Sequence, residues 1–396
     1  MKKSNIKRIL SGVFAMLMVC CIAFTTQGLT VNAAIVSGGK KNYSYKELKT
    51  DLKQLQKKYK DHCQVNVIGK TADKRNLYEV VIGNPNAKKH LLVIGNLHAR
   101  EHMTVQLCMK QIEYYLNNYN KKINGKKVSA TLNKVAIHYV PSCNPDGTAI
   151  SQKGFNAIRN KSLRNGLRRM GGSSSRWKAN ARGVDLNRNW KVAFKKAGKK
   201  GSSGYRGPKA ASEKEVQALV KWVNRIERRW KIAGVISYHS TGSILYGRCA
   251  SRATKKVRNI TTRMYKLAKS LTRYHLMPTE SISVARGCSR EYFLYKRNIP
   301  CITIEVGVGV APLSGREFNS IWNKNKNVVN IPMARQKCIE RSIVLVIESL
   351  FLADCAPDTS GRSITDSELV MAAGNNINGI AIPVSTPYIL RLSLCE

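Results

Sequence analysis

The sequence has few acidic residues: 23 Asp and Glu stand against 68 Lys and Arg, for a formal net charge of +45 over 396 residues. The basic excess precedes residue 336, because residues 336–396 hold four basic and seven acidic groups. Such a surface favours polyanionic partners and carries no information about the fold. The basic residues are dispersed without a nucleic-acid-binding motif, so we expect no nucleic-acid partner and favour an anionic cell-wall polymer. A merely solvated basic surface is the alternative.

Cysteine pairs of the CxxC type are absent, which argues against the common cysteine-based zinc sites. Of the eleven cysteines, Cys20 and Cys21 lie in the N-terminal apolar segment, which leaves nine. A chain of this length does not need disulfides to be stable, so we expect few bridges and several buried thiols. Cys249 and Cys288 are a candidate pair.

The sequence also lacks an apolar run long enough for a clear transmembrane helix. The run at residues 9–24 follows four basic residues and precedes Val31-Asn32-Ala33, which is the pattern of a secretory signal peptide. We therefore predict a signal peptide over residues 1–33, export, and no stable membrane insertion after cleavage; an uncleaved membrane anchor is the alternative. Residues 336–396 differ in composition from the rest and are treated as a C-terminal appendage of unknown structure and role.

Apolar runs that fit buried strands alternate with segments of helical periodicity. The expected strands are residues 65–69, 78–82, 91–95, 135–140, 232–238 and 301–306, and the expected helices are 46–59, 103–119, 212–230, 255–271 and 317–329. This order predicts an α/β fold with a mixed, mostly parallel central sheet flanked by helices, in one catalytic domain over residues 43–335.

Three local features add detail to this prediction. Asn144-Pro145-Asp146-Gly147 indicates a turn. Residues 151–183 are rich in Gly, Ser, Lys and Arg and are expected to form a long surface loop. Ser212 and Glu215 predict a capping box at the start of a helix.

Candidate metal ligands lie where strands end. His98 follows the strand at residues 91–95, Glu101 comes three residues later, and His239 follows the strand at residues 232–238. Sites in open α/β sheets gather at the carboxyl ends of strands. Zinc accepts imidazole nitrogen and carboxylate oxygen, and catalytic zinc sites use three protein ligands plus water. An HxxE pair alone is weak evidence, since a hydrogen-bonded structural histidine is the alternative.

Further polar residues accompany these ligands. Glu305 lies in an otherwise apolar strand, where a carboxylate should be paired or functional; an ion pair with a neighbouring arginine is the structural alternative. Arg188, next to Asn187, is suited to bidentate hydrogen bonding with a carboxylate. Asp185 can accept a hydrogen bond from a histidine ligand.

Together these segments resemble the zinc carboxypeptidases of the carboxypeptidase A type, peptidase family M14. The resemblance runs from about Tyr43 to Val329 and rests on six segments in the family's order and with similar spacing. They are His98-Ala99-Arg100-Glu101, Asn144-Pro145-Asp146-Gly147, residues 183–190, Gly207-Pro208 with Ser212-Glu213, Tyr238-His239-Ser240 and Thr303-Ile304-Glu305. Trp177-Lys178-Ala179-Asn180 before Gly183 is similar to the bacterial branch that includes γ-D-glutamyl-diamino acid peptidases.

The resemblance implies a zinc centre and a general base. One Zn²⁺ would be held by His98, Glu101 and His239, and Glu305 would deprotonate the zinc-bound water. The family also uses an arginine in the loop before the Asn-Arg motif to polarise the scissile carbonyl. Arg176 and Arg182 are both candidates for this role; spacing does not decide between them, and we assign it to Arg182 as an expectation.

The resemblance also implies how substrate is bound. Asn187 and Arg188 match the pair that binds the terminal carboxylate, and Arg100 matches a residue of the neighbouring subsite. Arg290 falls where the family sets side-chain preference. A cation there would favour an acidic side chain or a second carboxylate, as on diaminopimelate; an exposed arginine beside Glu291 is the alternative.

One position departs from the family pattern. Ser283 stands where the family places a mobile tyrosine, and Tyr292 or Tyr295 are candidate substitutes. This departure leaves the chemistry of hydrolysis intact and puts the substrate pocket in doubt.

The function predicted is that of a secreted, monomeric zinc metallocarboxypeptidase, a hydrolase of peptide bonds near a free carboxylate. Its substrates would be peptides or muropeptides, such as peptidoglycan stem peptides, and its location extracellular and associated with the cell wall. Two alternatives stay open: a catalytically silent cell-wall-binding protein on the same fold, and a deacylase of non-peptide amides.

Overall fold

The computed structural model describes residues 33–123, 125–247, 249, 251–277 and 286–329. The predicted signal peptide except for Ala33, the position of Ser283 and the C-terminal appendage lie outside the described residues. Across the described ranges, no helix combines the length and the apolar character needed to cross a bilayer.

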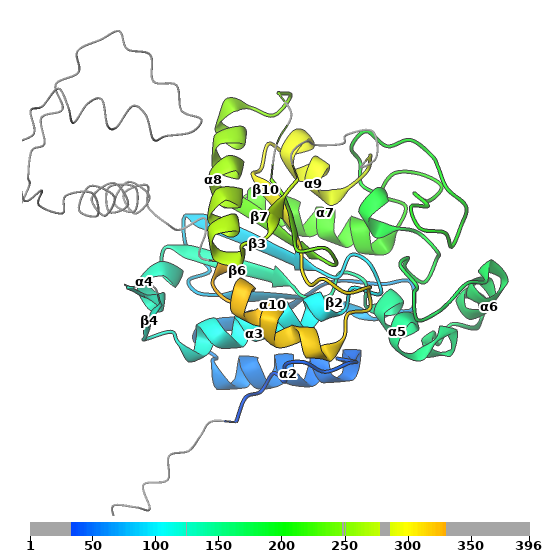
Figure 1. The fold of residues 1–396 in the computed structure, drawn as a ribbon, viewed down its shortest axis with the longest axis horizontal. Helices are drawn as coiled ribbons and strands as arrows, with labels where there is room; N and C mark the ends of the chain where they lie inside the picture. Colours follow the sequence, from blue (N-terminus) through cyan, green and yellow to red (C-terminus); the bar gives the residue numbers. More distant parts are fainter. Residues whose placement is uncertain (1–32, 124, 248, 250, 278–285, 330–396) are drawn as a thin grey trace, which may run out of the picture. The chain divides into compact units, whose positions relative to one another are not determined.

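Helices and strands alternate along the described chain (Figure 1). The strands of the main sheet are β1 (Cys63–Lys70), β2 (Asn76–Ile82), β3 (Lys89–Gly95), β6 (Val135–Val140), β7 (Lys231–His239), β8 (Ile244–Tyr246), β9 (His275–Leu276) and β10 (Cys301–Glu305). The longer helices are α2 (Tyr45–Lys58), α3 (Met103–Asn117), α5 (Pro145–Lys153), α6 (Lys161–Met170), α7 (Lys214–Glu227), α8 (Lys255–Thr272) and α10 (Phe318–Asn325). Shorter elements are β4 (Lys122–Ile123), β5 (Lys126–Lys127), α4 (Val128–Leu132) and α9 (Ser289–Glu291).

The main sheet is mixed, in the order β1-β2-β6-β3-β7-β10-β8-β9. Its centre is parallel, because β6 pairs with β3, β3 with β7 and β7 with β10 in the same direction. The pairs β1–β2, β2–β6 and β10–β8 are antiparallel. The carboxyl ends of β3, β7 and β10 therefore meet at one edge of the sheet, where α/β folds place their sites.

Both faces of the central strands are buried, as their continuous apolar sequence predicts. In β3, Leu91 and Val93 pack into the core covered by α2, α3, α8 and α10, whereas Leu92 and Ile94 pack into the core covered by α7 (Figure 1). This alternation follows from the two-residue period of a strand. The predicted α/β fold with a mixed, mostly parallel sheet flanked by helices is confirmed.

The segment at residues 151–183 differs from the predicted long loop. It contains the end of α5 and the whole of α6. Leu163, Leu167 and Met170 recur at helical spacing and pack in a cluster with Trp177, and the Asn160 side chain accepts a hydrogen bond from Leu163 N at the helix start. The many Lys and Arg residues and Gly166 obscured this short apolar stripe.

Three further local expectations need correction. The predicted capping box at Ser212 is wrong: α7 begins at Lys214, and the Ser212 hydroxyl donates to the Glu213 carboxylate. The predicted turn at residues 144–147 is the start of α5, where the Asn144 side chain accepts from Gly147 N. Cys249 and Cys288 are not joined by a disulfide, so that candidate pair is wrong.

Candidate active site

A buried polar turn carries the chain from β3 to the first candidate ligand. Asn96 has a positive φ of 59°, and its amide donates to the His98 carbonyl. The Asn96 side-chain oxygen Oδ1 accepts from the hydroxyls of Ser142 and Thr148 at 3.0 and 2.6 Å. Asn144 donates to the Leu97 carbonyl. These bonds fix the turn that aims His98 and Glu101 at the carboxyl edge of the sheet.

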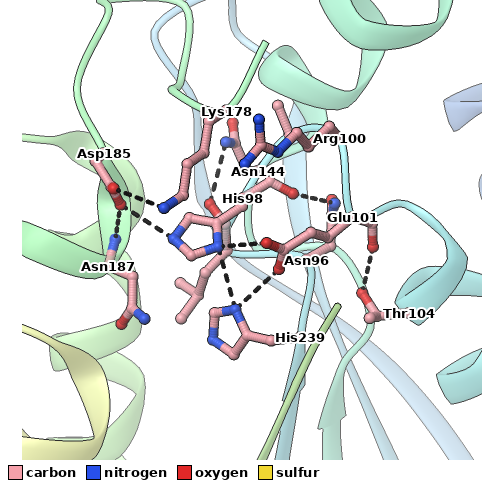
Figure 2. Close-up of polar contacts among 12 residues, drawn as sticks. Asn96, His98, Arg100, Glu101, Thr104, Asn144, Lys178, Asp185, Asn187 and His239 are labelled. Carbon is pink, nitrogen blue, oxygen red and sulfur yellow. Dashed lines mark hydrogen bonds and ion pairs between the residues drawn. The ribbon is translucent and has the colours of Figure 1, made fainter. Parts of the chain in front are cut away.

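The three candidate ligands converge (Figure 2). His98 Nδ1 lies 2.8 Å from Glu101 Oε1, His239 Nδ1 lies 2.9 Å from Glu101 Oε2, and the two Nδ1 atoms are 3.2 Å apart. All three side chains are buried, with residue exposures of 6%, 4% and 1%. Ligand atoms about 2.0–2.1 Å from one tetrahedral zinc lie about 3.3 Å from each other, so this spacing fits a shared cation.

Asp185 orients the first histidine. His98 Nε2 approaches Asp185 Oδ1 at 3.2 Å, and this bond leaves Nδ1 to present its lone pair toward Glu101 and His239. Asp185 Oδ1 also accepts from Asn187 N, so the same oxygen joins the ligand to the Asn-Arg motif. Burial disfavours ionisation of Asp185, but His98 and Lys178 hold the pKa of this carboxyl well below its usual range.

The electrostatic balance of the cluster favours a bound cation. Burial works against the charge of Glu101, yet His98 and His239 hold its pKa well below the usual value, so Glu101 is ionised. Burial likewise opposes a charge on His98, but the Glu101 and Asp185 carboxylates raise the pKa of its imidazole. Two anionic carboxylates thus surround the ring nitrogens, and a divalent ion can replace the protons between them.

Glu305 stands beside these groups on the next strand. It is the last residue of β10 and the Cα partner of His239 on β7. Burial raises the pKa of Glu305 to about 7, His239 opposes this rise and Glu101 adds to it. The positive charges of Lys178 and Arg188 also oppose the rise in this pKa.

The predicted carboxylate-binding residues Asn187 and Arg188 lie just after Asp185 in the chain. Asn187 Oδ1 accepts from the backbone N and the hydroxyl of Ser289, both at 2.9 Å, so its amide orientation is fixed. Arg188 is partly exposed and donates to the Asn187 carbonyl. Gly287 is required here, because a Cβ at this residue would lie 2.4 Å from the Arg188 carbonyl oxygen.

Arg290 is buried, with 7% exposure, which contradicts the alternative of an exposed arginine. Its guanidinium lies 5.9 Å from the ring centre of Tyr246 on β8. Burial and the Glu305 charge raise the pKa of Tyr246, while Arg290 and Arg188 oppose the rise. Glu305, both arginines and Tyr246 therefore lie within electrostatic reach of one another. The sequence offers no specific signal for Tyr246, which ends the short strand directly before α8.

The three other arginine candidates contact groups outside the three-ligand cluster. Arg182 is half-exposed and its Nε lies 3.3 Å from Glu213 Oε2, and Arg176 is exposed. Arg100 donates to the Arg176 carbonyl at a long 3.5 Å. Tyr292 is buried against Trp190 and Phe293, so it is a core residue and does not replace the tyrosine expected near Ser283.

Two further residues, Tyr295 and Lys178, have basic or acidic neighbours that the sequence did not predict. The Arg252 guanidinium lies 3.7 Å from the ring centre of Tyr295. Lys178 was overlooked: its ammonium lies 3.4 Å from Asp185 Oδ2, beside His98 (Figure 2). The sequence offered one signal for Lys178. It directly follows Trp177, which is buried, and it belongs to the segment Trp177-Lys178-Ala179-Asn180 that resembles the bacterial branch of the family.

The fold and the site define a class of protein. In the solved structure of thrombin activatable fibrinolysis inhibitor, the matched region covers 77% of this chain and 78% of the other, with a TM-score of 0.62 at 19% identity. A metallo-carboxypeptidase from Burkholderia cenocepacia matches with a TM-score of 0.52 at 16% identity, over 74% and 69% of the two chains. The architecture is that of the carboxypeptidases.

Sequence comparison gives the family itself. Residues 48–328 match the family model described as zinc carboxypeptidase, so the chain belongs to this family, peptidase family M14. Gamma-D-glutamyl-L-diamino acid endopeptidase 1 of Lysinibacillus sphaericus is 25% identical over 296 residues, 72% of this chain and 71% of the relative. Carboxypeptidase A2 of Rattus norvegicus is 31% identical over 131 residues, 32% and 28% of the two chains. The family is zinc-dependent, and the protein is a metallopeptidase.

Proposed function

We propose that the protein binds one zinc ion through His98, Glu101 and His239 and hydrolyses peptide bonds near a free carboxylate. The observation that carries this proposal is the convergence of two imidazole nitrogens and a carboxylate within 4.8 Å of one another, with Glu305 on the neighbouring strand. The donor set is the one that catalytic zinc uses, three protein ligands with room for water. When bound, zinc lowers the pKa of a water molecule and polarises a carbonyl.

Glu305 is the residue proposed to move the proton. A carboxylate with a pKa raised toward neutrality by burial can accept a proton from the attacking water and return it to the leaving amine. Asp185 holds the His98 ring in place throughout, because its carboxylate is fixed by the backbone N of Asn187 as well as by His98.

Arg188, Asn187 and Arg290 define the proposed substrate. Two arginines near Tyr246 and Glu305 suit a substrate end with two carboxylates, since guanidinium groups bind carboxylates in a fixed fork geometry. A diamino acid such as diaminopimelate carries such a pair. The relative from Lysinibacillus sphaericus is named for γ-D-glutamyl-L-diamino acid cleavage, which supports peptidoglycan stem peptides as the substrate class.

The proposed location is outside the cell, at the cell wall. The charge and the N-terminal sequence pattern support it, and so does a basic cavity of about 560 Å³. Five cationic side chains and no acidic one line this cavity, over a floor that includes Ala211, Val220 and Tyr292: Lys191, Lys209, Lys221, Lys296 and Arg297. A phosphate-bearing wall polymer is the partner whose charge complements it.

The test is mass spectrometry of products from purified, zinc-loaded protein. Muropeptides containing γ-D-glutamyl-diaminopimelate and peptides ending in Glu, Lys or Phe are presented together with acylated amines. Zinc-dependent release of a diamino acid end is the expected result. Cleavage of acylated amines alone would make the protein a deacylase, and wall binding without any product would make it a silent binding protein.

A further inference from the structure

Family peptidases use an arginine to polarise the scissile carbonyl, and neither Arg176 nor Arg182 is placed for that role. Arg182 is half-exposed and pairs with the buried Glu213, and Arg176 is exposed. The cation that the structure does bring to the candidate metal cluster is Lys178. Its ammonium lies 3.4 Å from Asp185 Oδ2, and Figure 2 shows it beside the His98 ring.

The loop that carries Lys178 is held rigidly from both sides. Trp177 is buried and its indole donates to the Asn180 carbonyl at 3.1 Å. The Asn180 side chain is fully buried, where it donates to Glu213 and accepts from the backbone N of Arg182 and Val184. Because Trp177 and Asn180 fix the backbone on both sides of Lys178, the Lys178 side chain leaves the loop in a defined direction. A residue that contacts substrate needs such a fixed position.

The same loop is joined to the turn that carries the metal-ligand candidates. Ala99 N, between His98 and Glu101, donates to the Lys178 carbonyl at 3.0 Å. Ala179, the residue after Lys178, packs closely against Gly147. A Cβ on Gly147 would lie 2.5 Å from the Ala179 carbonyl oxygen, so only glycine permits this contact. Lys178 and His98 therefore keep a fixed relative position.

The Lys178 ammonium also has N–H donors that the Asp185 contact does not use. It carries three N–H donors, and the Asp185 contact of 3.4 Å is longer than a good hydrogen bond, so donors stay available for a substrate oxygen. Lys178 keeps 18% of its side chain exposed, which gives a substrate access.

We propose that Lys178, and not Arg182, donates to the scissile carbonyl oxygen and stabilises the negative charge that develops there during hydrolysis. A fixed cation aimed at a developing oxyanion acts in the transition state more than on the bound substrate. A lysine is a compact point charge, so it can contact one oxygen without the planar fork that an arginine requires. The inference deepens the proposed function and rests on it.

The experiment compares Lys178→Met with Arg182→Met on the best-hydrolysed peptide of the product screen. Loss of one oxyanion donor lowers kcat by roughly 10²–10³-fold, so we expect that loss for Lys178→Met with KM changed by less than about threefold. Arg182→Met should stay within about threefold of wild type. Lys178→Arg, which restores a cation, should recover part of kcat.

Two further measurements separate this role from a structural one and from failure of the proposed function. Lys178→Met should keep its zinc content and unfolding midpoint, and it should bind a phosphinic pseudopeptide, a mimic of the tetrahedral oxyanion, at least about tenfold more weakly than wild type. Loss of zinc, or a kcat loss in Arg182→Met only, would overturn the assignment to Lys178. A wild-type protein that hydrolyses no peptide would refute the proposed function itself, whereas unchanged phosphinate binding in Lys178→Met would refute the Lys178 inference alone.

Discussion

Glu305 and His239 face each other as Cα partners at the carboxyl ends of the adjacent parallel strands β10 and β7. One carries the proposed base and the other a proposed zinc ligand. Because paired strands keep their register, the distance between the two side chains is set by the sheet and not by a loop. The proposed base and one proposed zinc ligand are therefore held on one rigid edge of the sheet.

Removal of His239 should abolish metal binding. His239→Ala takes away one of three donors, and a two-donor site holds zinc weakly, so we expect loss of bound zinc and of activity. A chelator should inactivate the wild type, and added zinc should restore it. His275→Ala, at an exposed histidine, is the matched control and should keep full zinc content by elemental analysis. A fully active preparation without bound metal would contradict the assignment.

Glu305→Gln should separate metal binding from catalysis. The amide cannot accept the proton of the attacking water, and general base catalysis typically contributes about 10²–10⁴-fold, so kcat should fall by that factor. The zinc content should be unchanged, because Glu305 is not among the three converging ligands. Steady-state kinetics beside elemental analysis check both statements. Hydrolysis at the normal rate would show that another group is the base.

Arg290→Asp should change the preferred substrate end. The substitution reverses the charge near Tyr246, so peptides with acidic or diamino acid ends should lose kcat/KM by roughly 10–100-fold, and basic ends should gain. Because Arg290 is buried, Arg290→Met is made in parallel as a variant without a buried negative charge, and it should lose the acidic preference without gaining a basic one. An unchanged ranking in both variants would remove Arg290 from the pocket.

Glu215 should make stability depend on pH. Burial, together with Asp146, raises its pKa to about 8 from an ordinary value of 4.5. The folded state then binds more protons than the unfolded state between these values, so this group's contribution is fully present below about pH 4.5 and is lost as pH rises to 8. The free energy of unfolding should fall by at most about 1.4 kcal/mol per pH unit from this one group. Urea unfolding at pH 5 and 8 should show it in the wild type, and Glu215→Gln should flatten it; equal slopes would contradict the prediction.

The basic cavity should govern polyanion binding. Replacement of Lys191, Lys209 and Lys221 by Gln removes three charges from its wall, and each cation near an anionic surface contributes on the order of 1 kcal/mol. Binding of poly(glycerol phosphate) should therefore weaken by roughly 100-fold at physiological salt. Replacement of three exposed lysines on or near α2, Lys53, Lys57 and Lys60, is the charge-matched control. Equal weakening in both triple variants would show that only net charge matters.

Much of the fold could be predicted because the signals are local. The continuous apolar run of β3 and the exact match of β6 to residues 135–140 reflect burial on both faces, which leaves its mark in a few consecutive residues. The short α6 was missed because its stripe of Leu163, Leu167 and Met170 is interrupted by charged residues and Gly166. Its stability depends on packing against Trp177 and not on its own composition.

By itself, the sequence determined the α/β class, the family and the residue types that a zinc peptidase needs, because His98 and Glu101 are close in the chain and His239 and Glu305 each lie at the end of an apolar strand. Only the tertiary structure decided that His239, 141 positions away from His98, lies 3.2 Å from it. The structure also decided that Lys178 faces the site while Arg182 turns to Glu213. The physical reason is that strand order and buried hydrogen bonds between distant loops set these directions, and neither leaves a periodic pattern in the chain.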